Sequence, residues 1–157
     1  MGDVSDVRAV AKIYFNGIHS WLPVVPESQF YECLPSIFIS PKADQSLLCL
    51  SMALINLFPT SEDGYSDEGK FNTLYTLLKI VIARLEAADI NSIEVVQGRL
   101  LVTLFEVGHG INGAYISIAA LARAAAAIGI NETVNAPVSP KCEEQLRVWW
   151  GIVMLDR

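Results

Sequence analysis

Three glycines in the second half of the chain have the spacing of a cofactor-binding motif. Gly108, Gly110 and Gly113 match the pattern G-x-G-x-x-G. In dinucleotide-binding proteins this pattern follows a buried strand and opens a helix, and an acidic residue about 20 positions further on binds the ribose. Here an apolar run at residues 100–107 precedes the glycines, and Glu132 stands at about that distance.

The polar residues before this motif nevertheless favour a turn between two helices. Arg99, Thr103 and Glu106 recur at helical spacing, which indicates that the preceding run is a helix. No second strand leads into Glu132, and no parallel sheet is predicted that could form a cofactor crevice. We therefore predict a helix–turn–helix corner and no cofactor-binding residue.

Two histidines are the next candidates for chemistry. Glu106 and His109 are three positions apart, so on a helix they would be neighbours and could exchange a proton. No serine or cysteine stands in a recognisable nucleophile motif for such a pair to serve. We favour a His109 that ends a helix beside its negative dipole, and a His19 that packs beside Trp21 at the end of the first helix. The sequence predicts no catalytic residue and no enzyme.

Metal binding and ligand stacking are also weakly supported. Cys33, Cys49 and Cys142 are odd in number and far apart, which argues against a disulfide framework and fits a reducing compartment. No C-x-x-C or H-x-x-x-H pair provides zinc ligands, so we predict no metal site. Trp149 and Trp150 could stack on a ligand, but we favour core packing.

The charge pattern argues against nucleic acid as a direct partner. The chain has 157 residues, suited to one domain or part of one, with 11 basic and 17 acidic residues and a net charge of −6. The basic side chains are scattered, so they form no footprint for a phosphate backbone or an anionic membrane.

No membrane or secretory segment is predicted either. The acidic start at residues 1–6 does not fit a secretory signal. The longest weakly polar run, residues 114–130, contains Arg123 and much alanine, whereas a membrane span needs about 20 predominantly apolar residues. We expect an intracellular chain in which this run is a buried helix.

Periodicity and capping residues predict an all-α fold of about seven helices in stacked antiparallel pairs. Ser5, Asp44, Ser92 and Ser139 are the expected N-caps. The expected helices span residues 5–19, 27–34, 45–58, 67–88, 92–107, 114–128 and 139–155. An acidic surface loop is expected at residues 59–69, and Gly129 should end the sixth helix.

The last predicted helix is apolar over most of its circumference. Such a helix needs partners on all sides, so we expect the domain to be incomplete at the C-terminus. The rest of the domain, a partner protein or a second copy of the chain would then cover this helix. Its apolar residues are Leu146, Val148, Trp149, Trp150, Ile152, Val153, Met154 and Leu155.

Four segments together resemble the fungal-specific transcription factor domain, the middle homology region of fungal binuclear zinc-cluster regulators. The resemblance covers nearly the whole chain, in order, and its last block is the most distinctive. The segments are Tyr14-Phe15 through Trp21-Leu22-Pro23 to Phe30-Tyr31; Leu74-Tyr75 with Leu85-Glu86-Ala87 and Ser92-Ile93; Ala114-Tyr115 with Ser117-Ile118 and Ala122-Arg123; and Glu143-Glu144 with Arg147-Val148-Trp149-Trp150 and Leu155-Asp156-Arg157.

The resemblance implies a partial all-α regulatory domain, residues 1–157, of a nuclear transcription factor. The family's six-cysteine zinc cluster is not found in these residues, so the resemblance implies zinc and DNA contact only through a segment outside them. Such domains are thought to hold the factor inactive or to respond to inducers. A free-standing helical adaptor that binds a protein through its last helix is the alternative function.

Overall fold

The predicted all-α class is confirmed. The computed structural model describes residues 4–57, 68–135 and 139–157, and these contain seven α-helices, two 3₁₀ turns and no strand. The α-helices are α1 (Val4–Asn16), α2 (Glu27–Ile39), α3 (Ala43–Asn56), α4 (Glu68–Ala87), α5 (Ile93–Gly108), α6 (Ala114–Ala127) and α7 (Pro140–Leu155). The 3₁₀ turns are η1 (Ile18–Ser20) and η2 (Ile130–Asn135).

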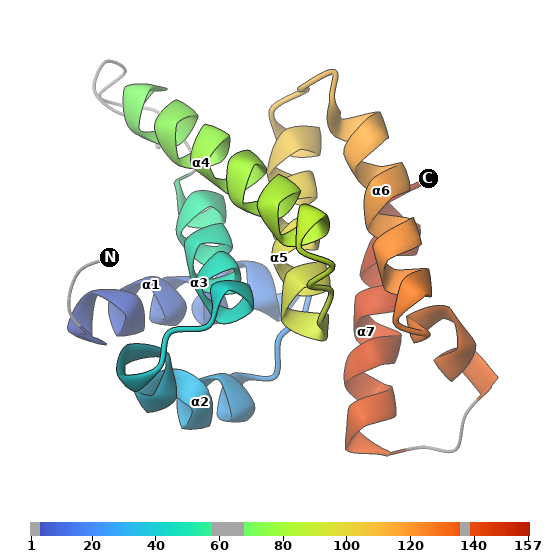
Figure 1. Cartoon of the computed structure of the whole chain (residues 1–157), viewed down its shortest axis with the longest axis horizontal. Coiled ribbons are helices and arrows are strands. Elements are labelled where there is room, and N and C mark those ends of the chain that lie inside the picture. The colour runs from blue at the N-terminus through green and yellow to red at the C-terminus, as the bar shows by residue number, and fades with distance from the viewer. Residues whose placement is uncertain (1–3, 58–67, 136–138) are drawn as a thin grey trace.

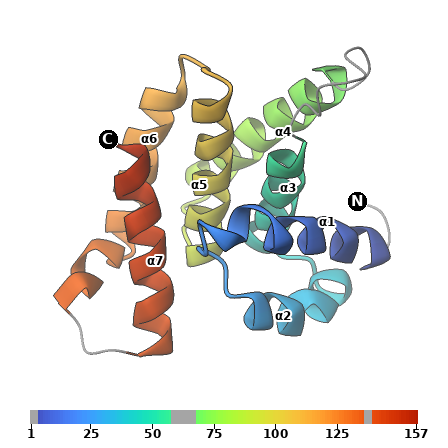
Figure 2. The same cartoon turned by 180° about the vertical axis from the view of Figure 1, so that it is seen from behind.

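Successive helices from α3 to α7 alternate in direction, while α1 and α2 run across the end of this group (Figure 1). The view from behind shows α5 between α3 on one side and α7 on the other (Figure 2). None of the helices in the described part is both long and apolar enough to span a lipid bilayer. Residues 59–67 of the predicted acidic loop lie outside the described residues. Its last two positions, 68 and 69, belong to α4, so that end of the prediction is wrong.

Two of the four predicted N-caps are confirmed. Ser92 accepts a hydrogen bond from the Val95 amide at 3.4 Å, and Ser139 accepts one from the Cys142 amide at 3.2 Å. The prediction for Ser5 is wrong, because α1 already includes that residue.

Asp44 lies inside the first turn of α3, and Lys42 occupies the N-cap position, so the predicted Asp44 cap is also wrong. The carboxylate of Asp44 accepts hydrogen bonds from the Gln45 amide at 2.8 Å and from the Ser92 hydroxyl at 3.3 Å. An acidic side chain in a first helical turn is favourable because the N-terminal end of the helix is partly positive. Asp44 therefore ties the start of α3 to the start of α5.

Helix α2 is longer than predicted. It continues through Pro35 and ends at Ile39 instead of at residue 34. A proline inside a helix leaves the carbonyl four residues earlier without its amide donor, which usually ends or bends the helix. Leu34 and Ile37 lie three positions apart and are both buried, so packing of this face offsets the missing hydrogen bond.

The core is organised around α5. Every residue from 95 to 103 is buried, and α3, α6 and α7 all pack against this helix. Glycines allow two of these close approaches. A Cβ at Gly98 would lie 3.0 Å from Leu47 Cγ on α3, and a Cβ at Gly151 of α7 would lie 2.9 Å from Leu100 Cδ1 on α5. The absence of side chains at these positions brings the three helices together.

Candidate functional site

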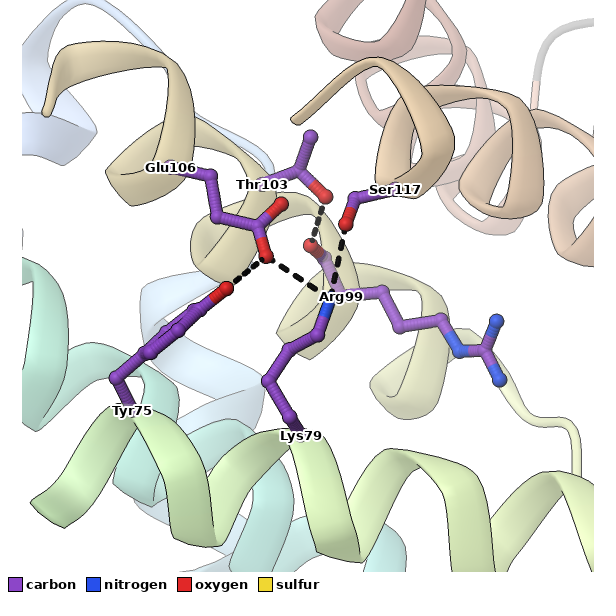
Figure 3. A network of polar contacts seen from close by, with 6 residues as sticks. All are labelled: Tyr75, Lys79, Arg99, Thr103, Glu106 and Ser117. Carbon is purple, nitrogen blue, oxygen red and sulfur yellow. Dashed lines mark hydrogen bonds and ion pairs between the residues drawn. The ribbon is translucent and has the colours of Figure 1, made fainter. Parts of the chain in front are cut away.

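A buried polar network joins α4, α5 and α6. Arg99, Thr103 and Glu106 follow one another along α5, as their helical spacing predicts. A row of polar side chains on a helix usually faces water, but the structure buries all three. The reason is that α4 and α6 cover this side of α5, so their contacts replace water (Figure 3).

Glu106 is the centre of the network and is fully buried. Its Oε1 atom accepts hydrogen bonds from the Tyr75 hydroxyl at 2.7 Å and from Lys79 Nζ at 2.9 Å. Lys79 also donates to the Ser117 hydroxyl at 2.9 Å, so one ammonium group connects three helices (Figure 3). In the described part of the chain Glu106 Oε2 has no hydrogen-bond partner.

Burial and the neighbouring carboxylate both change the acidity of Tyr75. Desolvation raises the pKa of its hydroxyl, and the hydrogen bond to Glu106 and the negative charge of Glu106 raise it further. Tyr75 therefore stays protonated and acts as a hydrogen-bond donor. This fixed donor, together with Lys79, suits a structural clamp on Glu106.

Arg99 is held separately, further from the centre of the network. Its Nη2 atom lies 3.0 Å from Glu86 Oε2, and the Arg99 side chain is 9% exposed whereas that of Glu86 is 68% exposed. Thr103 donates its hydroxyl hydrogen to the carbonyl of Arg99 at 2.8 Å. Arg99 Nε is buried and has no hydrogen-bond partner among the described residues.

The glycine segment is the predicted corner between two helices. It connects α5 to α6, and Gly110 has a φ of +64°, a conformation that side chains with a Cβ rarely adopt. His109 occupies the C-cap of α5, stacks on Phe105 with ring centroids 3.9 Å apart, and donates from Nδ1 to the Phe105 carbonyl at 2.9 Å. The predicted helix-ending role of His109 is confirmed.

The other aromatic predictions are confirmed in part. The His19 ring lies edge-on to Phe15, with centroids 5.0 Å apart, at the packed end of the N-terminal helical segment. Burial lowers the pKa of His19, an effect larger than the opposing charge of Glu27. Trp149 packs against the core, but the core prediction for Trp150 is wrong because its side chain is largely exposed.

The three cysteines are free thiols. Cys49 is buried, and burial raises the pKa of its thiol to about 11, which keeps it unreactive near neutral pH. Within the described ranges, no three His, Cys, Asp or Glu side chains come together in an arrangement that could hold a metal ion. The absence of zinc and of cofactors from this chain stays a prediction.

A second polar cluster was missed by sequence reasoning. The Gln97 amide group is buried and donates to the Val24 carbonyl and to Glu144 Oε1, each at 2.8 Å. Burial raises the pKa of Glu144, and the charge of Glu94 raises it further, against the lowering effects of the Gln97 hydrogen bond and Lys141. Nothing in the spacing along the chain indicates that residues 97 and 144 meet, because the contact depends on how α7 packs on α5.

Residues 11–157 match the family model of the fungal specific transcription factor domain. A relative from Botryotinia fuckeliana (strain B05.10), called Transcription factor BOA15, is 28% identical over 130 residues, which cover 82% of this chain and 69% of the relative. No solved structure matches the chain.

Proposed function

This chain belongs to the fungal specific transcription factor domain family, and from that membership we propose that it is the regulatory, middle homology region of a zinc-cluster transcription factor. In this proposal it regulates transcription in the nucleus through helix packing. Zinc and DNA contact belong to a zinc-cluster domain outside these residues. The observation that carries the proposal is the family match over nearly the whole chain.

Charge distribution supports the absence of a DNA contact. The net charge is −6, and three cations on the helices are engaged by carboxylates of the chain itself: Lys79 by Glu106, Arg99 by Glu86 and Arg147 by Glu143. A DNA-binding surface needs several cations free to contact phosphates. We expect no sequence-selective binding of duplex DNA by the purified chain at moderate salt, which a mobility-shift assay would test.

Helix α7 is the proposed interaction surface. Val148, Gly151 and Ile152 are buried on its inner side, whereas Trp150 and Met154 are more than half exposed. These two residues are four positions apart, so they lie on the same side of the helix. We propose that this side packs against the rest of the regulatory domain or against a protein partner, and a second copy of the chain is a further option.

A reporter experiment tests the regulatory role. The chain would be fused to a heterologous DNA-binding domain in a fungal cell, and reporter transcription would be compared with that of the DNA-binding domain alone. We expect a change in transcription that the double variant Trp150→Gln, Met154→Gln removes. Ile39→Gln is the matched control, because Ile39 is 85% exposed but lies on α2.

Unchanged transcription, or an equal loss with the control variant, would contradict the proposal. A free-standing adaptor that binds a protein through the same side of α7 is the alternative function. It would bind its partner without changing transcription of the reporter.

A further inference from the structure

A groove between α4 and α6 lies above the buried face of α5. It has a volume of about 190 Å³, and its lining combines apolar side chains, among them Ile82, Val102 and Ile116, with Lys79 and Arg99. A second hollow of about 300 Å³ continues from it and shares Glu86, Arg99 and Ala120 with its lining. Arg99 therefore lies where the two hollows meet.

The guanidinium group of Arg99 is only partly used. Glu86 contacts Nη2 alone, at 3.0 Å, and the adjacent Nε has no hydrogen-bond partner within the described part of the chain. These two nitrogens form one edge of the guanidinium plane, and their parallel N–H bonds match both oxygens of a carboxylate. A carboxylate placed against this edge would satisfy the buried Nε donor that Glu86 leaves unsatisfied.

The Glu86 side chain can readily be displaced from Arg99. Its side chain is 68% exposed, so it can move into water without crossing packed residues. It is also in the last turn of α4, where the negative end of the helix dipole disfavours a carboxylate. The single contact that Glu86 makes with Arg99 is therefore a weak competitor for an incoming anion.

We propose that this groove binds a small monocarboxylate with an aliphatic tail. Its head would pair with Nη2 and Nε of Arg99 in place of Glu86, and its tail would lie against Ile82, Val102 and Ile116. Positive and negative side chains are equal in number along the two hollows and in the network behind them. The positive ones are Lys79, Arg99 and Arg123, and the negative ones are Glu86, Asp89 and Glu106. This balance favours a monoanion over a phosphate dianion, which needs an excess of positive charge.

Titration of the full chain with isovalerate tests the proposal, with isovaleramide as the uncharged analogue of the same shape. The readout is the ¹H–¹⁵N NMR signal of Arg99 Nε together with the backbone signals of α4, α5 and α6. We expect isovalerate to shift these signals in a saturable way and isovaleramide to leave them in place. Arg99→Lys, which removes the Nε donor, should weaken binding about tenfold or more.

Glu86→Gln provides the decisive variant, because it removes the competing carboxylate at an exposed position and should tighten isovalerate binding several-fold. Glu132→Gln removes one exposed negative charge elsewhere and should leave the affinity unchanged. Equal shifts with isovaleramide, or a Glu86→Gln affinity no higher than that of Glu132→Gln, would overturn the proposal even if Arg99→Lys failed to fold. The proposal goes beyond the regulatory function above, and its failure would leave the reporter test unaffected.

Discussion

Gly98 lies in the first half of α5, where this helix packs closely against α3. A Cβ at this position would approach Leu47 Cγ to 3.0 Å and Ser51 Oγ to 3.3 Å, and both neighbours are fully buried. The branch point of a leucine cannot turn aside as a terminal methyl group can, so the two helices would have to separate. At the scale of single residues, the crossing of these helices depends on one missing side chain.

Gly98→Ala should therefore destabilise the fold despite the better helix propensity of alanine. Overpacking in a core costs about 1–3 kcal/mol, and alanine recovers roughly 1 kcal/mol of propensity. We expect a net loss of about 1 kcal/mol in the free energy of unfolding, measured by urea denaturation. Gly108→Ala is the control in the same helix, because nothing lies within 4 Å of its Cβ position. A Gly98→Ala variant as stable as this control would contradict the prediction.

The Glu144 side chain provides a residue-scale test by pH. Burial raises the pKa of Glu144 in the folded state, so the folded protein holds this proton more tightly than the unfolded chain does. The resulting contribution to the free energy of unfolding is present at acidic pH and is lost as pH rises through the folded pKa. Glu144→Gln removes the charge and keeps an oxygen that can accept from Gln97. We expect this variant to be more stable than the wild type at pH 7, with the difference disappearing toward pH 4.

Urea denaturation at several pH values measures this difference. Glu143→Gln is the matched control, because it removes the same charge from the same helical turn at an exposed position, where Glu143 pairs with Arg147. The control variant should be no more stable than the wild type at pH 7. A constant effect of Glu144→Gln across the pH range would argue against burial as the cause.

At the scale of whole elements, local sequence signals predicted where most helices lie along the chain. They did not predict the features that depend on packing between helices. The Ser92 and Ser139 caps depend on neighbouring residues, so the sequence alone indicates them. The continuation of α2 through Pro35 depends on core packing of its far end, which no local pattern contains. The burial of Arg99 and of Glu106 similarly depends on α4 and α6, whose positions are set by the tertiary fold.

The same limit applied to the candidate site. Helical spacing correctly placed Arg99, Thr103 and Glu106 in one row, because that row is a property of α5 alone. Glu106 contacts Tyr75 and Lys79 of α4, and Lys79 in turn contacts Ser117 of α6. Spacing along the sequence does not predict such contacts between helices. A polar residue at a core position indicates a buried hydrogen-bond partner. The sequence does not show which positions are in the core, so this signal can be recognised only once the fold is known.

The contact between α4 and α5 gives a prediction at this scale. Lys79→Met would leave the fully buried Glu106 carboxylate with Tyr75 as its remaining donor. Breaking a buried ion pair from one side costs about 3–5 kcal/mol, and the partial exposure of Lys79 puts this case at the lower end. Adding Glu106→Gln removes the stranded charge, so the double variant should be more stable than Lys79→Met alone. Urea denaturation of the variants measures the coupling.

Arg147→Met is the control, because it breaks an ion pair with Glu143 in which both side chains are substantially exposed. Such a surface pair contributes about 0–1 kcal/mol, so this variant should stay close to the wild type. If Lys79→Met were equally harmless, the Glu106 carboxylate would not need its cation, and the network would not hold α4 in place.

At the scale of the whole molecule, the balance between apolar and charged residues is unusual. Hydrophobic residues make up 52% of the chain and charged residues 18%, against about 25% charged residues in typical soluble domains. The described part of the chain buries a continuous core around α5 yet leaves several large apolar side chains in water. Those on the later helices are Tyr115, Ile116, Trp150 and Met154. A contiguous patch of such side chains marks an interaction site or causes association. Trp150 and Met154 are four positions apart on α7, so they are neighbours on the helix surface.

The isolated chain should therefore self-associate through α7. Trp150 and Met154 are 56% and 53% exposed on one side of this helix. Covering a large apolar side chain gains roughly 1.5–3 kcal/mol when burial is complete, so two half-exposed ones favour a weak, concentration-dependent complex. Sedimentation velocity should show a mass that rises with protein concentration.

The double variant Trp150→Gln, Met154→Gln should return the chain to a monomer. Its helical circular dichroism should stay unchanged, since neither residue belongs to the buried core. Ile39→Gln, on α2, should leave the association intact. A wild-type chain that stays monomeric at every concentration would contradict self-association through this side of α7.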